Sequence, residues 1–186
     1  MIRRAMLLAA MIFSALCAAP VIAMAQGNPD PQNTLVIDLK DGQVLIALRP
    51  DLAPQHVERI KTLTKQGFYD GLVFHRVIEG FMAQTGDPKG TGAGGSTLPN
   101  LPAEFSKEPF ERGTLGMART SDPNSANSQF FITFEDTPHL NGQYTVFGKV
   151  ISGMQFVDKI KRGAPGSGAV TEPDKMMKVR LLADAK

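Results

Sequence analysis

The hydrophobic pattern first becomes typical of β-strands at residues 34–39, Thr-Leu-Val-Ile-Asp-Leu, and again at residues 44–48, Val-Leu-Ile-Ala-Leu. Asp41-Gly42 lies between the two segments, and this pair favours a tight hairpin turn. The pattern therefore predicts a β-hairpin at the start of the domain.

After the hairpin, the spacing of apolar residues changes from that of a strand to that of a helix. Val57, Ile60 and Leu63 recur at helical spacing, and Gly67 offers a left-handed stop, so a helix is predicted from residue 53 to residue 66. A second, short helix is predicted over residues 154–161. The apolar stripe of the first helix is interpreted as a core face.

The remaining pattern consists of short strands separated by turn residues. They are predicted at residues 73–77, 81–84, 113–118, 129–133, 145–150 and 177–182. With the hairpin this makes about eight strands and two helices. That count favours a mainly β fold, a closed barrel capped by helices, over alternating strand-helix units.

The first 25 residues have the layout of a secretory signal peptide. Arg3 and Arg4 precede an apolar run over residues 5–20, and Ala-Met-Ala at residues 23–25 suits cleavage. A twin-arginine signal and a lipid anchor on Cys17 fit less well, because the residues beside each motif differ from what those pathways accept. Simple export to the periplasm, without a stable membrane anchor, is the prediction.

Removing 25 of the 186 residues changes the composition. The remaining 161 residues suit one domain, with a flexible leader at 26–33 and a folded domain at 34–186. Both removed charges are arginines, so 18 basic and 18 acidic residues remain and nucleic acid loses support as a partner. Cys17 is the only cysteine, which excludes disulfides and cysteine metal ligands from the mature chain.

A glycine run at residues 90–95, Gly-Thr-Gly-Ala-Gly-Gly, matches the dinucleotide-binding pattern. Two prolines within residues 96–102 exclude the helix whose N-terminus would hold the pyrophosphate. A nucleotide-dependent oxidoreductase is therefore the least favoured class. The glycines are interpreted as a loop that folds closely over neighbouring structure.

Conventional catalytic groups are not evident. His56, His75 and His139 have no zinc-site spacing, and there is no Gly-x-Ser-x-Gly nucleophile motif. His56 is expected to face solvent from the first helix. The chain predicts no metal and no cofactor.

The most specific signal is Phe-His-Arg-Val-Ile-Glu-Gly-Phe-Met-Ala-Gln-Thr-Gly-Asp at residues 74–87, with Met-Ala-Arg at 117–119, Ser-Gln-Phe-Phe-Ile at 128–132 and Phe-Gly-Lys-Val at 147–150. Together these motifs resemble the cyclophilin family of peptidyl-prolyl isomerases, over about residues 34–182. The form of residues 117–123 resembles bacterial members. The resemblance implies a closed eight-stranded antiparallel β-barrel and an activity on proline-containing polypeptides.

The resemblance also assigns site residues. Arg76 matches the catalytic arginine, and Gln84 and Phe131 are expected to act with it. The residues that match the family's proline-ring pocket are Phe81, Met82, Phe131 and Leu140. Those that match peptide-holding positions are Gln84, Gln129, Ala118 and Arg119, the last two chiefly through the backbone.

Two positions depart from common family members. His139 replaces the tryptophan of cyclosporin-sensitive animal cyclophilins, so cyclosporin binding is expected to be weak. Tyr144 stands where many members have histidine. Both are expected near the substrate, and the chain is expected to be a monomer.

Rotation about an X-Pro bond explains why such residues suffice. The rotation must cross a barrier of about 18 to 20 kcal/mol, but it breaks no covalent bond and requires no proton transfer. A permanently charged donor such as Arg76 can stabilise the twisted amide, while apolar walls hold the ring. The alternative is a proline-peptide-binding chaperone module with little essential turnover.

Overall fold

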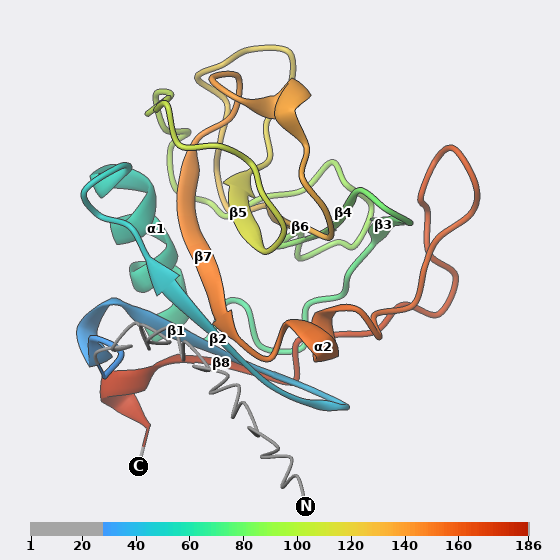
Figure 1. Cartoon of the computed structure of the whole chain (residues 1–186), viewed down its shortest axis with the longest axis horizontal. Helices are drawn as coiled ribbons and strands as arrows, with labels where there is room; N and C mark the ends of the chain where they lie inside the picture. Colours follow the sequence, from blue (N-terminus) through green and yellow to red (C-terminus); the bar gives the residue numbers. More distant parts are fainter. Residues whose placement is uncertain (1–27, 186) are drawn as a thin grey trace, which may run out of the picture.

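The structure, a computed structural model, describes residues 28–185, so the predicted signal peptide at 1–25 lies outside the described residues. Eight strands form one antiparallel sheet (Figure 1). They are β1 (Thr34–Leu39), β2 (Gly42–Leu48), β3 (Arg76–Ile78), β4 (Met82–Thr85), β5 (Thr114–Met117), β6 (Phe130–Thr133), β7 (Val146–Ser152) and β8 (Lys178–Leu181).

The predicted hairpin is confirmed, but its turn lies one residue earlier than expected. Leu39 pairs with Gly42, which leaves Lys40 and Asp41 as the two turn residues. Gly42 begins β2 at φ +152°, and a Cβ there would lie 2.5 Å from the ring of Phe156. The glycine is needed because that aromatic ring packs directly on the backbone.

The sheet is curled rather than fully closed. Its strand order is β3-β4-β6-β5-β7-β2-β1-β8, which leaves β3 and β8 as edges. Isolated bridges join Val73 to Lys175 and Arg76 to Ala169 across the seam. The predicted closed barrel is therefore corrected to a curled half-barrel, because short edge strands bridge the seam at single residue pairs without forming a ladder.

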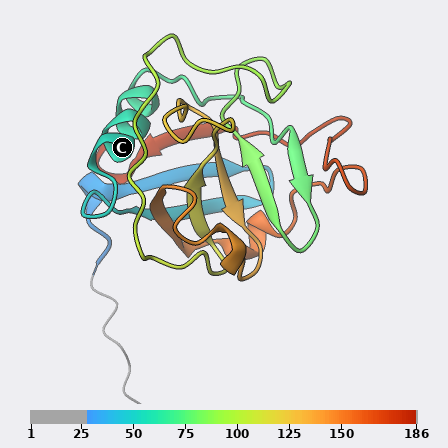
Figure 2. The same cartoon turned by 90° about the horizontal axis from the view of Figure 1, so that it is seen from above.

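Helices lie beside this curved sheet (Figure 2). The first, α1 (Pro54–Lys65), agrees with the prediction and packs against β8. The second, α2 (Met154–Val157), is shorter than predicted. Beyond it the amides of Lys159 and Ile160 bond three residues back, so the chain continues in tighter turns instead of an α-helix.

Short 3₁₀ turns complete the secondary structure: η1 (Pro31–Asn33), η2 (Pro138–Leu140) and η3 (Leu182–Asp184). Lys61 of α1 donates to the side chain of Asn33 at 2.6 Å and ties η1 to the domain. None of the described helices is long and apolar enough to span a bilayer.

The expectation that His56 faces solvent is wrong. Its exposed fraction is 0%, and its Nδ1 lies 2.6 Å from the carboxylate of Glu104. The same carboxylate accepts the backbone amides of Gln55 and His56 at the start of α1. His56 is buried because it lies four residues before Ile60 on the inward face and finds its polar partner in a distant loop.

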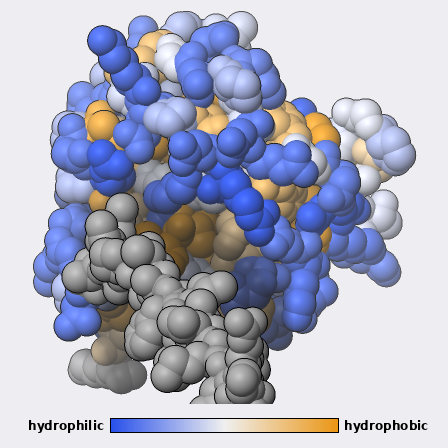
Figure 3. Space-filling model, in the orientation of Figure 1, coloured by the Kyte–Doolittle hydropathy of each residue, from blue (hydrophilic) through white to orange (hydrophobic). Residues whose placement is uncertain are grey.

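The core divides into two clusters. The larger cluster combines residues of the sheet with the inward face of α1. The smaller cluster consists of Met82, Phe110, Phe131, Leu140 and Val146. The face shown in Figure 3 is predominantly hydrophilic around limited apolar areas. The smaller cluster contains residues predicted to hold a proline ring, so core packing and the site share side chains.

Candidate active site

Arg76 begins the edge strand β3 and is held from two directions. The register of β3 and β4 places it opposite Gln84, whose Oε1 accepts from Arg76 Nη1 at 3.2 Å. On the other side Arg76 Nε donates to the carbonyl of Ser167 at 3.2 Å. That carbonyl belongs to the loop between α2 and β8, which projects beside β3 (Figure 1). The guanidinium is therefore fixed in place before any substrate arrives.

Gln84 in turn orients a second side-chain amide, that of Gln129. Its Nε2 donates to Gln129 Oε1 at 2.9 Å, and Gln129 Nε2 donates to the carbonyls of Gly92 and Gly94 at 3.0 and 2.8 Å. A continuous hydrogen-bonded chain thus links Arg76 to the glycine run. Each amide has its orientation set by a neighbour on both sides.

The glycine run folds around one buried carboxylate, which confirms its interpretation as a closely packed loop. Asp87 accepts the backbone amides of Lys89, Thr91, Gly92 and Gly94 at 2.7 to 3.2 Å. Burial alone would raise the pKa of Asp87, but these amides outweigh it and lower the pKa below its ordinary value. A Cβ on Gly94 would lie 2.0 Å from the carboxylate, so only glycine fits.

A cavity of about 180 Å³ opens beside Arg76, and we call it the apolar cavity after the side chains that form its floor. Every residue that lines it belongs to the predicted site: Arg76, Phe81, Met82, Gln84, Ala118, Arg119, Phe131, Leu140 and Tyr144. Met82, Phe131 and Leu140 are buried, which gives the cavity a fixed apolar floor. Such a cavity suits a small aliphatic ring.

Aromatic contacts shape the outer wall of this apolar cavity. The rings of Phe131 and Tyr144 meet edge to face at 5.7 Å. The guanidinium carbon of Arg119 lies 4.6 Å from the centre of the Tyr144 ring. His139 does not line the cavity; it is exposed, with its ring 5.4 Å from that of Phe81 at the outer edge.

A polar cavity of about 330 Å³ adjoins the first. The two share Gln84, Ala118 and Arg119 as a common rim. The glycine run forms one side of the polar cavity, and Gln129 lines it rather than the apolar one. Three of the four predicted peptide-holding residues, Gln84, Ala118 and Arg119, therefore lie along the boundary between the two cavities.

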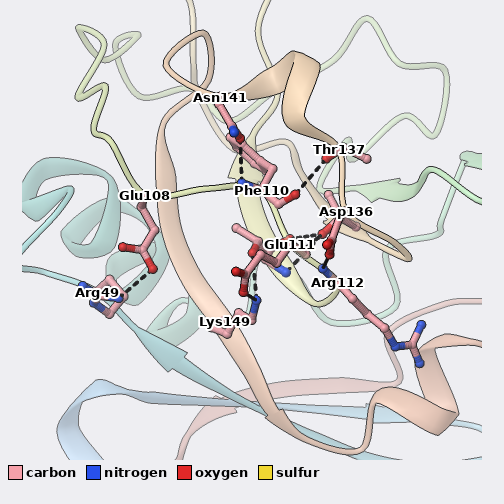
Figure 4. Close-up of polar contacts among 11 residues, drawn as sticks. Arg49, Glu108, Phe110, Glu111, Arg112, Asp136, Thr137, Asn141 and Lys149 are labelled. Carbon is pink, nitrogen blue, oxygen red and sulfur yellow. Dashed lines mark hydrogen bonds and ion pairs between the residues drawn. The ribbon is translucent and has the colours of Figure 1, made fainter.

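Phe110 is a supporting residue that the sequence did not reveal. It is 1% exposed and its ring stacks on Phe131, with centres 5.7 Å apart and an interplanar angle of 22°. Its amide donates to Asn141 Oδ1 at 2.8 Å and its carbonyl accepts the amide of Thr137 at 2.7 Å (Figure 4). Phe110 thus holds both the floor of the cavity and the η2 turn that carries Leu140.

The segment around Phe110 is anchored by charged neighbours. Glu108 pairs with Arg49 at 3.3 Å and Glu111 pairs with Lys149 at 3.1 Å (Figure 4). These exposed pairs contribute little stability individually. They do fix the path of a segment that has no regular secondary structure.

Among the described residues, no group of three or more His, Cys, Asp or Glu side chains could hold a metal ion. Burial is the main cause that lowers the pKa of both His56 and His75 below its ordinary value. Glu104 opposes this effect at His56, and Asp87 opposes it at His75. His75 lies beneath the glycine run, with its ring 3.6 Å from the position of a Cβ on Gly92.

A comparison with known families decides what this arrangement is. Residues 34–181 match the family model described as cyclophilin type peptidyl-prolyl cis-trans isomerase/CLD. The chain belongs to the cyclophilin family. The activity of this cyclophilin is accordingly peptidyl-prolyl cis-trans isomerisation, and both the predicted family and the predicted activity are confirmed.

Relatives in bacteria and eukaryotes agree. This cyclophilin is 57% identical to a probable peptidyl-prolyl cis-trans isomerase of Brucella suis, over 94% of this chain and 98% of the relative. It is 44% identical to the isomerase CYP18-1 of Arabidopsis thaliana, over 68% of this chain and 81% of that protein.

Solved structures support the same fold. Cyclophilin AquaCyp293 from Hirschia baltica aligns with a TM-score of 0.76 and 26% identity, covering 85% of this chain and 77% of the other. A cyclophilin type isomerase of Cryptosporidium parvum, solved in the presence of the dipeptide Ala-Pro, aligns with a TM-score of 0.74 and 30% identity. That alignment covers 80% of this cyclophilin and 98% of the Cryptosporidium chain.

Proposed function

We propose that this cyclophilin accelerates the folding of exported proteins in the periplasm, with Arg76 as its catalytic donor. One observation carries the role of Arg76: a guanidinium held by Gln84 and by the carbonyl of Ser167 lies at the edge of an apolar cavity. The predicted signal peptide supports the compartment. Exported chains cross the membrane unfolded and must then complete their slow X-Pro rotations.

The chemistry requires a donor that binds the twisted amide more strongly than the planar one. At the twisted geometry the prolyl nitrogen regains a lone pair, which a cationic N-H group can hydrogen-bond. The side chain of an arginine such as Arg76 is cationic and presents its donors in a planar fork. Selective stabilisation of the twisted state raises the rate, whereas equal binding of both states would not.

Arg76 supplies only part of the acceleration. One well-placed donor is worth about 3 to 4 kcal/mol, and enzymes lower barriers by about 8 kcal/mol or more. The walls formed by Met82, Phe131 and Leu140 would hold the proline ring and exclude water. Gln84 and Gln129 would hold the peptide on the other side of the bond, so that rotation is confined to one amide.

Export is tested by expressing the full-length chain in a bacterial host and determining the N-terminus of the periplasmic product. We expect a product that begins at Gln26, and a chain lacking residues 1–25 to remain in the cytoplasm. Recovery of the intact precursor from the cytoplasm alone would contradict export.

Folding assistance is tested with a small exported protein whose slow refolding phase is limited by proline isomerisation. The chain starting at Gln26 should accelerate that phase, and Arg76→Ala should lose most of the effect. An unchanged slow phase with the wild-type protein would contradict the proposed role. Circular dichroism of the variant controls for folding.

The apolar floor also favours a second role as a proline-peptide-binding chaperone, because Phe131 and Leu140 can hold a ring without Arg76. In that role Phe131→Ala abolishes peptide binding, while Arg76→Ala preserves the cellular function. Loss of function in Arg76→Ala cells would exclude it.

We also propose that this cyclophilin is a monomer and that it binds cyclosporin weakly. His139 presents an exposed imidazole at the edge of the cavity in place of an indole. A smaller ring offers less apolar contact area to a large cyclic ligand. Titration calorimetry with cyclosporin should show tighter binding to His139→Trp than to wild type, and sedimentation should give a single-chain mass.

A further inference from the structure

The groove formed by the two cavities carries positive charge without a carboxylate. Among the described residues that line it, the only charged side chains are Arg76 and Arg119. Arg76 donates to Gln84 and to the carbonyl of Ser167, and Arg119 donates to backbone carbonyls including that of Gln143. All of these partners are uncharged, so neither guanidinium is paired with a carboxylate.

This charge is local. Most arginines elsewhere on the described surface have acidic partners: Arg112 pairs with Asp158 at 2.7 Å, and Arg162 pairs with Glu79 at 2.6 Å. Arg59 is the exception and donates only to backbone carbonyls. Beyond the predicted signal peptide the chain has equal numbers of basic and acidic residues. The positive potential therefore belongs to the groove and does not reflect the net charge of the domain.

Arg119 is held rigidly at the rim that the two cavities share. Its Nε and Nη2 donate to the carbonyl of Gln143 at 3.2 and 3.0 Å, and its Nη1 donates to the carbonyl of Thr120 at 2.8 Å. Its guanidinium also lies over the Tyr144 ring. An approaching anion would not have to order this side chain, so less of the attraction is lost to conformational entropy.

We propose that the groove favours proline segments in which an acidic residue immediately precedes the proline, and that Arg119 is the residue that determines this preference. The inference rests on the proposed function, in which the ring occupies the apolar cavity. The preceding residue then lies on the far side of the X-Pro bond, along the shared rim of Gln84, Ala118 and Arg119. A carboxylate at that position would approach the Arg119 guanidinium.

Nearby carboxylates limit where the preference extends. Asp87 lies beneath the glycine run, but four backbone amides already bind its charge. Asp122 lies on an exposed turn between Thr120 and Ser125, two residues that line the polar cavity, and it accepts the amide of Asn124. Because Asp122 carries a negative charge on this turn, we expect the preference to be confined to the residue beside the proline.

The preference is tested with acetyl-Ala-X-Pro-Phe-amide peptides in which X is Glu, Gln or Lys, with isomerisation measured by exchange NMR. Neutral ends and the absence of a coupling protease leave X as the only varied charge. Exposed charge pairs change such ratios by about 1.4-fold to 5-fold, so we expect about 3-fold higher kcat/KM for Glu than for Gln at low salt. The order should be Glu, then Gln, then Lys.

Two variants and one condition identify the source of the ratio. Arg119→Gln should bring the Glu-to-Gln ratio to about 1, and Arg119→Lys, which keeps the charge, should retain a ratio above 1. Lys65→Gln removes the same charge from the exposed end of α1 and should leave the ratio unchanged. Raising ionic strength to about 1 M should reduce the wild-type ratio, because the screening length falls to about 3 Å.

Equal kcat/KM for the three peptides, or a ratio that persists in Arg119→Gln, would overturn the inference while leaving the isomerase activity intact. Failure to turn over any of the peptides would instead contradict the isomerase function. If Arg119→Gln fails to fold, the salt dependence of the wild-type ratio decides, and a ratio that does not fall with salt overturns the inference.

Discussion

The ring of Phe110 lies stacked on the ring of Phe131, 5.7 Å away, beneath the apolar cavity. Phe110 comes from an irregular loop and Phe131 from β6, so this contact joins the loop to the sheet at the site. The backbone of Phe110 also bonds to residues on either side of the η2 turn. One residue therefore supports two walls of the cavity.

Phe110→Ala should lower both stability and activity. Removal of a buried aromatic ring costs about 3 to 5 kcal/mol, and Phe131 would lose the surface that holds its orientation. Urea unfolding measures the first effect and kcat/KM on an Ala-Pro peptide measures the second. Phe110→Leu, which fills more of the space, should recover part of both; full activity in Phe110→Ala would contradict the supporting role.

Gly116→Ala should disturb the same contact from the other side. Gly116 pairs with Phe131 across β5 and β6, and a Cβ there would lie 2.5 Å from Phe131 Cζ and 2.7 Å from Phe110 Cε1. Overpacking of this kind costs about 1 to 3 kcal/mol and would displace the Phe131 ring. We expect reduced kcat/KM together with a lower urea midpoint.

Gly148→Ala is a matched control for that substitution. Gly148 is also a buried strand glycine, but its Cβ would meet Ala47 and Ile46 at 3.1 Å, away from the cavity. It should lower stability and leave kcat/KM of the folded protein unchanged. An equal loss of kcat/KM in the two variants would show that general destabilisation is responsible.

Much of the fold and the site could be predicted because the signals were local. Strand pattern, helical spacing at Val57, Ile60 and Leu63, and the motif around Arg76 all lie within short segments. The burial of His56 depends on Glu104, 48 residues away, so a polar residue on the inward face was misassigned. The closure of the sheet was overestimated because the number of strands does not reveal whether the two edge strands pair with each other.

Phe110 could not be found in the same way. It lies in a segment without helical or strand periodicity, and its partners Phe131, Asn141 and Thr137 are 21 to 31 residues further along the chain. The carbonyl of Ser167 that holds Arg76 is 91 residues from it. Contacts of this range arise from the path of the folded chain, and no pattern within a short window encodes them.

Arg76→Lys should reduce kcat/KM by about 100-fold to 1,000-fold, nearly as much as Arg76→Ala. Lysine keeps the charge but lacks the planar fork that contacts Gln84 and Ser167 together, so the donor would no longer be held in one position. Exchange NMR on an Ala-Pro peptide measures the change. Retention of more than half of the wild-type value by Arg76→Lys would mean that charge alone suffices.

Asp87→Asn should loosen the glycine run and lower stability by about 1.5 to 3 kcal/mol, the usual worth of hydrogen bonds to a charged group. A neutral amide accepts fewer of the four backbone amides, so the carbonyls of Gly92 and Gly94 would no longer fix Gln129. Amide hydrogen exchange should rise across residues 89–95.

Asp122→Asn is the matched control for Asp87→Asn. Its carboxylate accepts one exposed backbone amide, that of Asn124, and so contributes little to the stability of the fold. Exchange at residues 89–95 should be unchanged in this variant. Equal exchange rates in wild type and Asp87→Asn would contradict the role assigned to Asp87.

His75 makes the stability of the fold depend on pH. Burial lowers the pKa of His75, with Asp87 opposing and Arg76 adding to the effect. The histidine pKa in the unfolded chain is about 6.5. At pH values between the folded-state pKa and about 6.5, the unfolded chain therefore binds a proton at His75 that the folded chain does not bind. The stability contributed by neutral His75 is present above pH about 6.5 and is lost as the pH falls through the folded-state value.

His75→Phe removes this titration while keeping a planar ring of similar outline. The free energy of unfolding, measured in urea between pH 7.5 and 5.5, should fall less steeply in His75→Phe than in wild type. One histidine can change the slope by at most about 1.4 kcal/mol per pH unit. His56 is buried as well and its pKa is also lowered, so the variant should keep part of the wild-type slope. Identical slopes in the two proteins would show that His75 is protonated as readily in the folded chain as in the unfolded one.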